Sequence, residues 1–144
     1  LNRGSFEKLL HMYENGDTPY ALILIDVDTF KTVNDMYGHA VGDEILKKVT
    51  GLLKKAFRSI DHVCRIGGDE FCAVTEGVTE EEFMELRRGM NDRIEALNGR
   101  FFENKMSVAS GYAAYDKKSN HDIHDTIKRA DQKMYECKAA MKGR

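Results

Sequence analysis

The stretch that decides the fold is Arg65-Ile66-Gly67-Gly68-Asp69-Glu70-Phe71, which joins two short apolar segments, 62–66 and 71–74. Two successive glycines between such segments predict a tight hairpin turn. The glycines also allow a phosphate to approach closely, because they lack a Cβ atom. Asp69 and Glu70 follow them, and adjacent carboxylates suit a divalent cation. These residues alone leave open a metal–phosphate site and an exposed acidic turn.

The composition is that of an ordinary globular domain. The chain has 144 residues, of which 42% are hydrophobic and 32% charged, and its formal net charge is -2. This length suits one domain with a two-layer core, and the small net charge argues against nucleic acid as a partner. No segment has the length of a membrane span and no signal peptide is visible. We therefore expect a cytoplasmic domain, whose parent protein could still be membrane-anchored.

Cysteine usage and the first residues bear on the cell compartment and on domain organisation. Cys64, Cys72 and Cys137 form no CxxC pair, and we expect Cys64 and Cys72 to be reduced core thiols. The chain starts at Leu1 without a methionine, so we expect residues 1–144 to be a single domain taken from a longer signalling protein.

Hydrophobic periodicity predicts an alternation of helices and strands along the chain. Ser5 is a possible N-cap for the first helix, and Thr79 opens another with the capping-box residue Glu82. The predicted helices cover residues 5–14, a short segment after residue 28 that ends at Gly38, 42–57, a segment from Thr79, and Asp122 to about Met141. The predicted strands cover 21–25, the two arms of the hairpin, and 105–115. This order predicts an α+β fold with a mixed, mainly antiparallel central sheet covered by helices.

Asp26 and Asp28 follow the apolar run 21–25, where a strand ends and a ligand site is common. If the hairpin pairs beside this strand, Asp69 or Glu70 faces Asp26, and the converging carboxylates would form a Mg²⁺ site. The next residues, up to Lys31, would supply N–H groups and a positive charge for a phosphate. Each acid alone also fits a strand end or a helix cap.

The pentapeptide Gly67–Phe71 is the signature of the GGDEF domain, and the chain resembles a bacterial diguanylate cyclase. The similarity extends in order through 26–35, 37–43 and the C-terminal segment that contains Arg129-Ala130-Asp131, Met134-Tyr135 and Cys137-Lys138. It implies the nucleotidyl cyclase or polymerase-palm fold. It also implies condensation of two GTP into cyclic di-GMP and two pyrophosphates across a two-fold homodimer. Any fused sensory domain would lie outside this chain.

The resemblance also implies roles for individual residues. Asp26, the Val27 carbonyl and Asp69 would hold Mg²⁺, with Mn²⁺ as an alternative, and Asp69 and Glu70 would be catalytic. Asn34 and Asp43 would read the guanine edge, although without the resemblance a helix-end Asn and an N-capping Asp are the default interpretation. The implied substrate-binding residues are Thr29, Phe30, Lys31, Asn34, His39, Asp43, Gly67, Gly68, Lys138 and Lys142.

Arg58 and Asp61 match the family's RxxD inhibitory site for the product, where an arginine can pair with phosphate and guanine. On spacing alone, an Arg and an Asp three residues apart more often form a local ion pair at a helix end. Arg87 or Arg88 could be a further ligand of that site.

The C-terminal segment departs from the family pattern. Lys142 stands where the family has an arginine, and Arg144 is displaced. This departure keeps a second hypothesis open: a catalytically weak or silent domain that binds GTP or cyclic di-GMP as a sensor.

Overall fold

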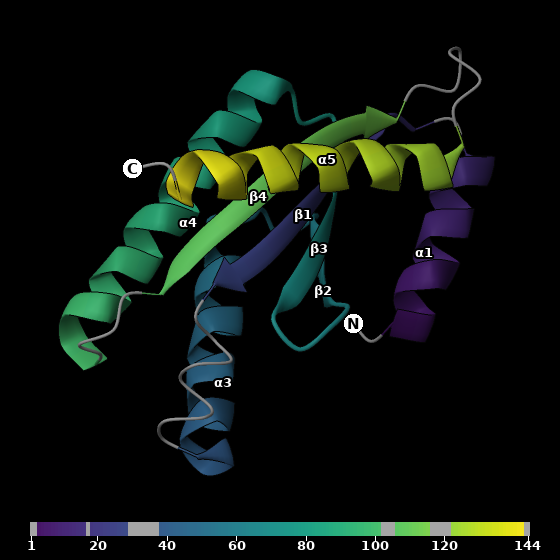
Figure 1. Ribbon diagram of the computed structural model, residues 1–144. Coiled ribbons are helices and arrows are strands. Elements are labelled where there is room, and N and C mark those ends of the chain that lie inside the picture. The colour runs from purple at the N-terminus through teal and green to yellow at the C-terminus, as the bar shows by residue number, and fades with distance from the viewer. Residues whose placement is uncertain (1–2, 17, 29–37, 102–105, 116–121, 143–144) are drawn as a thin grey trace.

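The computed structural model describes residues 3–16, 18–28, 38–101, 106–115 and 122–142 (Figure 1). The helix predicted between residue 28 and Gly38 lies outside these ranges. The other predicted elements are present and in the predicted order. They are α1 (Arg3–Asn15), β1 (Tyr20–Asp28), α3 (His39–Ala56), β2 (His62–Arg65), β3 (Glu70–Glu76), α4 (Glu80–Phe101), β4 (Ser107–Tyr115) and α5 (Ile123–Lys142).

The strands form one four-stranded sheet in the order β2-β3-β1-β4. Every neighbouring pair is antiparallel. The α+β prediction is therefore confirmed, and the described sheet is antiparallel rather than mixed. The central strand β1 is buried from Tyr20 to Val27, as its apolar sequence predicts. None of the helices in the described ranges has the length and apolar character needed to cross a membrane.

Alternation along β1 divides the core into two layers, one on each face of the sheet. Ile23, Ile25 and Val27 pack with residues of α3 and α4. Leu22 and Leu24 pack with residues of α1 and α5 on the opposite face, where α5 crosses the strands (Figure 1). Asp26 shares the parity of Leu22 and Leu24, so its side chain points toward the α5 face.

The start of α3 differs from the prediction. The helix begins at His39 rather than at residue 42, and its N-cap is Gly38, with φ of 86°. A positive φ of this size is readily available only to glycine. Asp43 therefore lies inside the helix, and the interpretation of Asp43 as an N-cap is wrong. Ser5 likewise lies inside α1, which begins at Arg3.

The predicted N-cap bond at the start of α4 is present. The Thr79 hydroxyl oxygen accepts a hydrogen bond from the Glu82 backbone N–H at 3.1 Å, and the hydroxyl donates to Glu82 Oε1 at 3.2 Å. The first bond satisfies one backbone donor that would otherwise be unpaired at the start of the helix.

Gly111 in β4 allows the backbone of α5 to lie directly on the sheet. A Cβ atom at this position would collide with the Ala130 carbonyl oxygen and the Met134 nitrogen, and would lie 2.9 Å from the Lys133 carbonyl carbon. These are backbone atoms, which cannot move aside as a flexible side chain can. Gly111 therefore sets the distance between α5 and the sheet.

We expect Gly111→Ala to lower the free energy of unfolding by about 1–3 kcal/mol, because the added methyl group overpacks the α5–β4 contact. Urea unfolding followed by circular dichroism measures this change. Gly51→Ala is the matched control, since a Cβ atom there meets nothing within 4 Å. That helical substitution should raise stability by up to about 1 kcal/mol. Equal effects of the two substitutions would contradict the close packing at Gly111.

Candidate active site

The pairing of β1 with β3 brings the predicted acids together. Asp26 is the register partner of Glu70, the last pair of the ladder. One residue further, the Val27 backbone N–H donates to the Asp69 carbonyl oxygen at 2.9 Å. The hairpin therefore pairs beside the first strand, as expected, and Asp26, Asp69 and Glu70 meet at one end of the sheet. We call these three residues the acidic cluster.

The hairpin turn is closed by hydrogen bonds on both sides of the glycines. The Ile66 and Gly67 N–H groups both donate to the Glu70 carbonyl oxygen, at 2.9 and 3.3 Å. Arg65 donates from Nε to the Gly67 carbonyl oxygen at 2.9 Å and from Nη2 to that of Gly68 at 3.2 Å. Arg65 thus positions the turn, a role that sequence reasoning missed although this residue directly precedes the turn.

The two glycines are not required by the turn itself. Neither has a φ angle in the left-handed region. A Cβ atom on Gly68 would meet nothing within 4 Å, and one on Gly67 would make an ordinary 3.6 Å contact with Glu70. Backbone conformation and internal packing would therefore both accept a side chain here. The space that the glycines leave lies outside the loop, where a ligand can approach.

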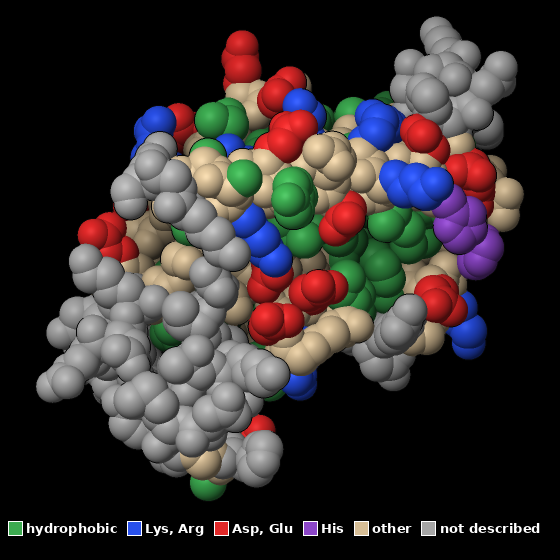
Figure 2. Space-filling view, viewed as in Figure 1, with side chains coloured by type: hydrophobic (Ala, Val, Ile, Leu, Met, Phe, Trp, Pro, Cys, Tyr) green, Lys and Arg blue, Asp and Glu red, His purple; other side chains and the backbone are tan. Residues whose placement is uncertain are grey.

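Burial and mutual repulsion set the electrostatics of the acidic cluster. Asp26 is 5% exposed, and its Oδ2 pairs with Lys138 Nζ from α5. Partial desolvation raises the pKa of the Glu70 carboxyl, although this residue is exposed. The charges of Asp26 and Asp69 raise that pKa further, while Lys138 opposes them. The hydrogen bond to Asp26 is the largest cause that raises the Lys138 pKa. Figure 2 shows acidic side chains gathered beneath α5 with a basic side chain beside them.

The donor set of the acidic cluster fits a hard divalent cation. Carboxylate and carbonyl oxygens are the ligands that Mg²⁺ prefers, and Mg²⁺ is commonly held by one or two carboxylates together with substrate phosphates. Among the described residues, no three His, Cys, Asp or Glu side chains are grouped so that they could hold a metal ion by themselves. A cation at the acidic cluster would therefore need further ligands, such as a backbone carbonyl or a substrate phosphate.

The remaining predicted substrate residues are only partly described. Thr29, Phe30, Lys31 and Asn34 lie outside the described residues. His39 is the first residue of α3 and Lys142 is the last of α5, but neither side chain is described. Asp43 is described, and it is exposed near the N-terminal end of α3.

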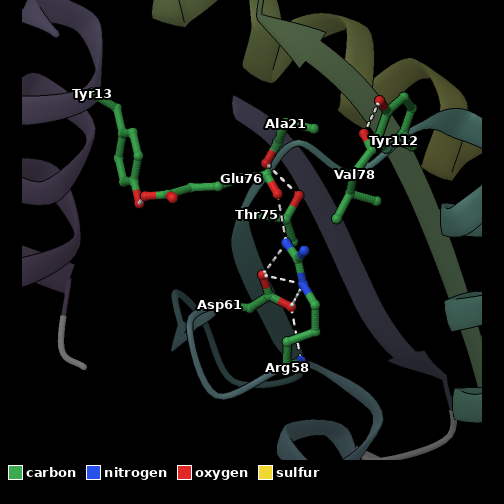
Figure 3. Close-up of polar contacts among 8 residues, drawn as sticks. All are labelled: Tyr13, Ala21, Arg58, Asp61, Thr75, Glu76, Val78 and Tyr112. Atoms are coloured by element: carbon green, nitrogen blue, oxygen red, sulfur yellow. Dashed lines mark hydrogen bonds and ion pairs between the residues drawn. The ribbon is translucent and has the colours of Figure 1, made fainter. Parts of the chain in front are cut away.

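The Arg58–Asp61 pair is formed within the chain (Figure 3). Arg58 donates from Nη2 to Asp61 Oδ1 at 2.8 Å and from Nε to both carboxylate oxygens at 3.2 Å. The same Nη2 donates to the Glu76 carbonyl oxygen at 2.6 Å. Arg58 thus links the segment before β2 to the end of β3, and the local ion pair that the spacing allowed is present.

The arginines expected near Arg58 have other partners. Arg87 donates to the Ser110 hydroxyl and carbonyl oxygens at 3.1 and 2.7 Å, and Arg88 pairs with Glu85 at 3.3 Å. A hollow of about 350 Å³ beside Arg58 is lined by Arg93 instead. Sequence spacing gave no signal for Arg93, because its position depends on how α4 packs beside α3.

The fold and the acidic cluster together define a cyclase-like α+β domain. A model of the family described as "Diguanylate cyclase, GGDEF domain" matches residues 1–144, and the chain belongs to this family. It is 35% identical over 136 residues to diguanylate cyclase DosC of Escherichia coli (strain K12), a match that covers 91% of this chain. The same match covers only 28% of DosC, so the chain spans less than a third of that relative.

Two solved structures resemble the chain over most of both lengths. The GGDEF domain of PA1120 (YfiN or TpbB) from Pseudomonas aeruginosa superposes with a TM-score of 0.80 at 26% identity, covering 97% of this chain and 91% of that chain. The active GGEEF domain of a diguanylate cyclase from Vibrio cholerae gives a TM-score of 0.74 at 29% identity. The match covers 96% of this chain and 85% of that chain. The predicted resemblance to the GGDEF family is thereby confirmed.

Tyr13 of α1 offers a pH test of how this helix is attached to the sheet. Its hydroxyl donates to Glu76 Oε1 at 2.5 Å, and burial together with this bond raises the pKa of Tyr13 to about 12. Unfolded tyrosine ionises near pH 10, so the folded state binds the proton more tightly and stability must fall as pH rises from about 10 to about 12.

We expect wild type to lose about 1 kcal/mol more stability than Tyr13→Phe between pH 10 and pH 11. Urea unfolding of both proteins at each pH measures the difference, and the shared contribution of the other tyrosines cancels. Parallel pH profiles for the two proteins would rule out the Tyr13–Glu76 bond.

Proposed function

We propose that this chain is the catalytic domain of a longer signalling protein and condenses two GTP into cyclic di-GMP, with release of two pyrophosphates. The observation that carries the proposal is the acidic cluster, which the register of β1 and β3 assembles. Membership of the GGDEF family supports the reaction type. The open space outside Gly67 and Gly68 supports the close approach of a nucleotide.

The metal would be Mg²⁺, or Mn²⁺ in its place, held by Asp26, the Val27 carbonyl and Asp69. When bound, it would neutralise charge on the phosphate oxygens during transfer. The chain's own contribution is position and burial: Asp26 is almost fully buried, and the backbone bond from Val27 to the Asp69 carbonyl fixes the two segments side by side.

Glu70 is suited to accept a proton, because partial desolvation and the neighbouring acids raise its pKa. The 3′-hydroxyl oxygen of one GTP would form a bond to the α-phosphorus of the other. The bond from that phosphorus to the pyrophosphate oxygen would break, and the hydroxyl proton would pass to Glu70 or Asp69. Because each protomer holds one GTP, two protomers would face each other across a two-fold axis.

Guanine recognition would fall to Asn34 and Asp43, with His39 beside the nucleotide. Asp43 is not a helix cap and its side chain is exposed, so it is free of the structural role that the sequence alone suggested. A carboxylate accepts hydrogen bonds from guanine N1–H and N2–H₂, which adenine lacks in that arrangement. The phosphates would be bound by Thr29, Phe30, Lys31, Gly67, Gly68, Lys138 and Lys142.

Product inhibition would use Arg58 and Asp61, with Arg93 as a further cation. Arg58 faces the hollow that Arg93 lines and a second one of about 300 Å³ on the side of His62. Because its guanidinium already binds Asp61 and the Glu76 carbonyl, a phosphate would have to compete for N–H donors in use. We therefore expect product binding to be weaker than at a preformed, unengaged arginine.

Glu70→Gln should lower the rate of cyclic di-GMP formation by at least about 100-fold, because it removes the proton acceptor without changing size. The assay incubates the protein with GTP and Mg²⁺ and quantifies cyclic di-GMP by chromatography. It uses high protein concentration, since turnover requires two protomers. The control is Glu81→Gln, an exposed acid on α4 that should leave the rate unchanged. Equal rates for wild type and Glu70→Gln would remove Glu70 from the mechanism.

Arg58→Ala should weaken cyclic di-GMP binding at least about tenfold, because it removes the charged fork that would bind phosphate. Titration calorimetry with cyclic di-GMP measures the affinity, and Lys128→Ala, which removes an exposed cation on α5, is the control. Unchanged affinity in Arg58→Ala would exclude the inhibitory site. Binding of cyclic di-GMP by a wild-type protein with no GTP turnover would favour the alternative function, a silent sensor domain.

A further inference from the structure

Lys138 lies near the C-terminal end of α5 and reaches a carboxylate 112 residues away in sequence. Its ammonium is paired with Asp26 Oδ2, at the centre of the acidic cluster. The lysine side chain is 35% exposed, whereas the Asp26 side chain is only 8% exposed. One partner is thus fixed in the core, and the other is a flexible chain that can leave toward solvent.

The charges around this contact favour a cation. Glu70 is the register partner of Asp26, and Asp69 directly precedes Glu70, so three acids share this end of the sheet. The Lys138 ammonium is paired with the buried one, Asp26. A buried carboxylate without a nearby positive charge is costly. The Lys138 ammonium therefore compensates, with a single charge, a group of acids that carries several.

The cation of the neighbouring turn is engaged in other contacts. Both donor groups of Arg65 that contact the turn bind the carbonyl oxygens of Gly67 and Gly68. Arg65 therefore cannot replace Lys138 at Asp26 without losing these bonds.

We propose that Lys138 is the resident counter-ion of the acidic cluster, and that a divalent cation displaces its ammonium from Asp26 when the metal binds. An ammonium and a divalent cation held by the same carboxylate repel each other at this distance, so binding of one weakens binding of the other. The displaced ammonium then lies beside the metal site on a four-carbon stem, where a substrate phosphate can receive it. This inference rests on the proposed function, because it takes the acidic cluster as the metal site.

The exchange makes a prediction that a purely structural lysine does not. If Lys138 competes with the metal, removing its charge must raise the metal affinity of the nucleotide-free protein. If Lys138 serves only to hold α5 on the sheet, removing it lowers stability and leaves metal affinity equal or weaker.

The experiment titrates Mn²⁺ alone into the nucleotide-free chain and measures free Mn²⁺ by electron paramagnetic resonance. We expect Lys138→Met to bind Mn²⁺ about tenfold more tightly than wild type, because a competing positive charge next to the site is gone. Lys138→Arg keeps the charge and should bind no more tightly than wild type. Lys133→Met is the matched control on the same helix, since Lys133 forms only an exposed pair with Glu136.

Thermal unfolding of the same proteins gives a second measurement that needs no turnover. In metal-free buffer Lys138→Met should melt below wild type, because Asp26 has lost its counter-ion. Added Mn²⁺ should remove most of this deficit, whereas Lys133→Met should behave as wild type in both buffers.

Equal or weaker Mn²⁺ affinity in Lys138→Met, in a wild type that binds Mn²⁺ and turns over GTP, overturns the counter-ion role and leaves the proposed function intact. Absence of Mn²⁺ binding in every variant overturns both proposals. If Lys138→Met fails to fold, Lys138→Gln provides the uncharged variant, and the comparison with Lys138→Arg decides in the same way.

Discussion

The antiparallel register between β1 and β3 is the constraint on which the site depends. It places Asp26 opposite Glu70, and the bond from the Val27 N–H to the Asp69 carbonyl extends it by one residue into the turn. A slip of one residue would reverse the faces of β3, so that Glu70 would point toward the α3–α4 layer. The apolar residues Phe71 and Val74 therefore help to position the acids, since their burial fixes the register.

Side-chain alternation on β1 places an acid directly beside the apolar core. On this strand Leu22 and Leu24 pack under α5, and the next residue that faces α5 is Asp26. The fold thus buries one carboxylate at the edge of an apolar layer, where its charge is costly. Gly111 brings α5 close to the sheet, and Lys138, on the same helix, supplies the compensating charge. A buried charge at the edge of an apolar layer breaks a local sequence rule, and such exceptions are common at functional sites.

Sequence reasoning succeeded where the signal is local. The glycine hairpin, the buried strand at 21–25 and the Thr79 N-cap follow from residues within a few positions of one another. Features that depend on tertiary packing were missed: the pairing of Lys138 with Asp26, the contact of Arg87 with Ser110, and the position of Arg93. The start of α3 was misplaced because Gly38 was interpreted as a helix end, whereas the structure shows it as the N-cap of α3.

The most direct test of the account locates a bound metal by paramagnetic broadening of backbone amide signals in a nuclear magnetic resonance titration with Mn²⁺. The account predicts that the signals of Val27 and Asp69 broaden first, at low Mn²⁺ concentration. The signal of Gly77, beyond the opposite end of β3 and about 26 Å from Asp69 along the strand, should stay sharp. Broadening concentrated instead at Glu80–Glu82, the acidic first turn of α4, would contradict the claim that the strand register builds the metal site.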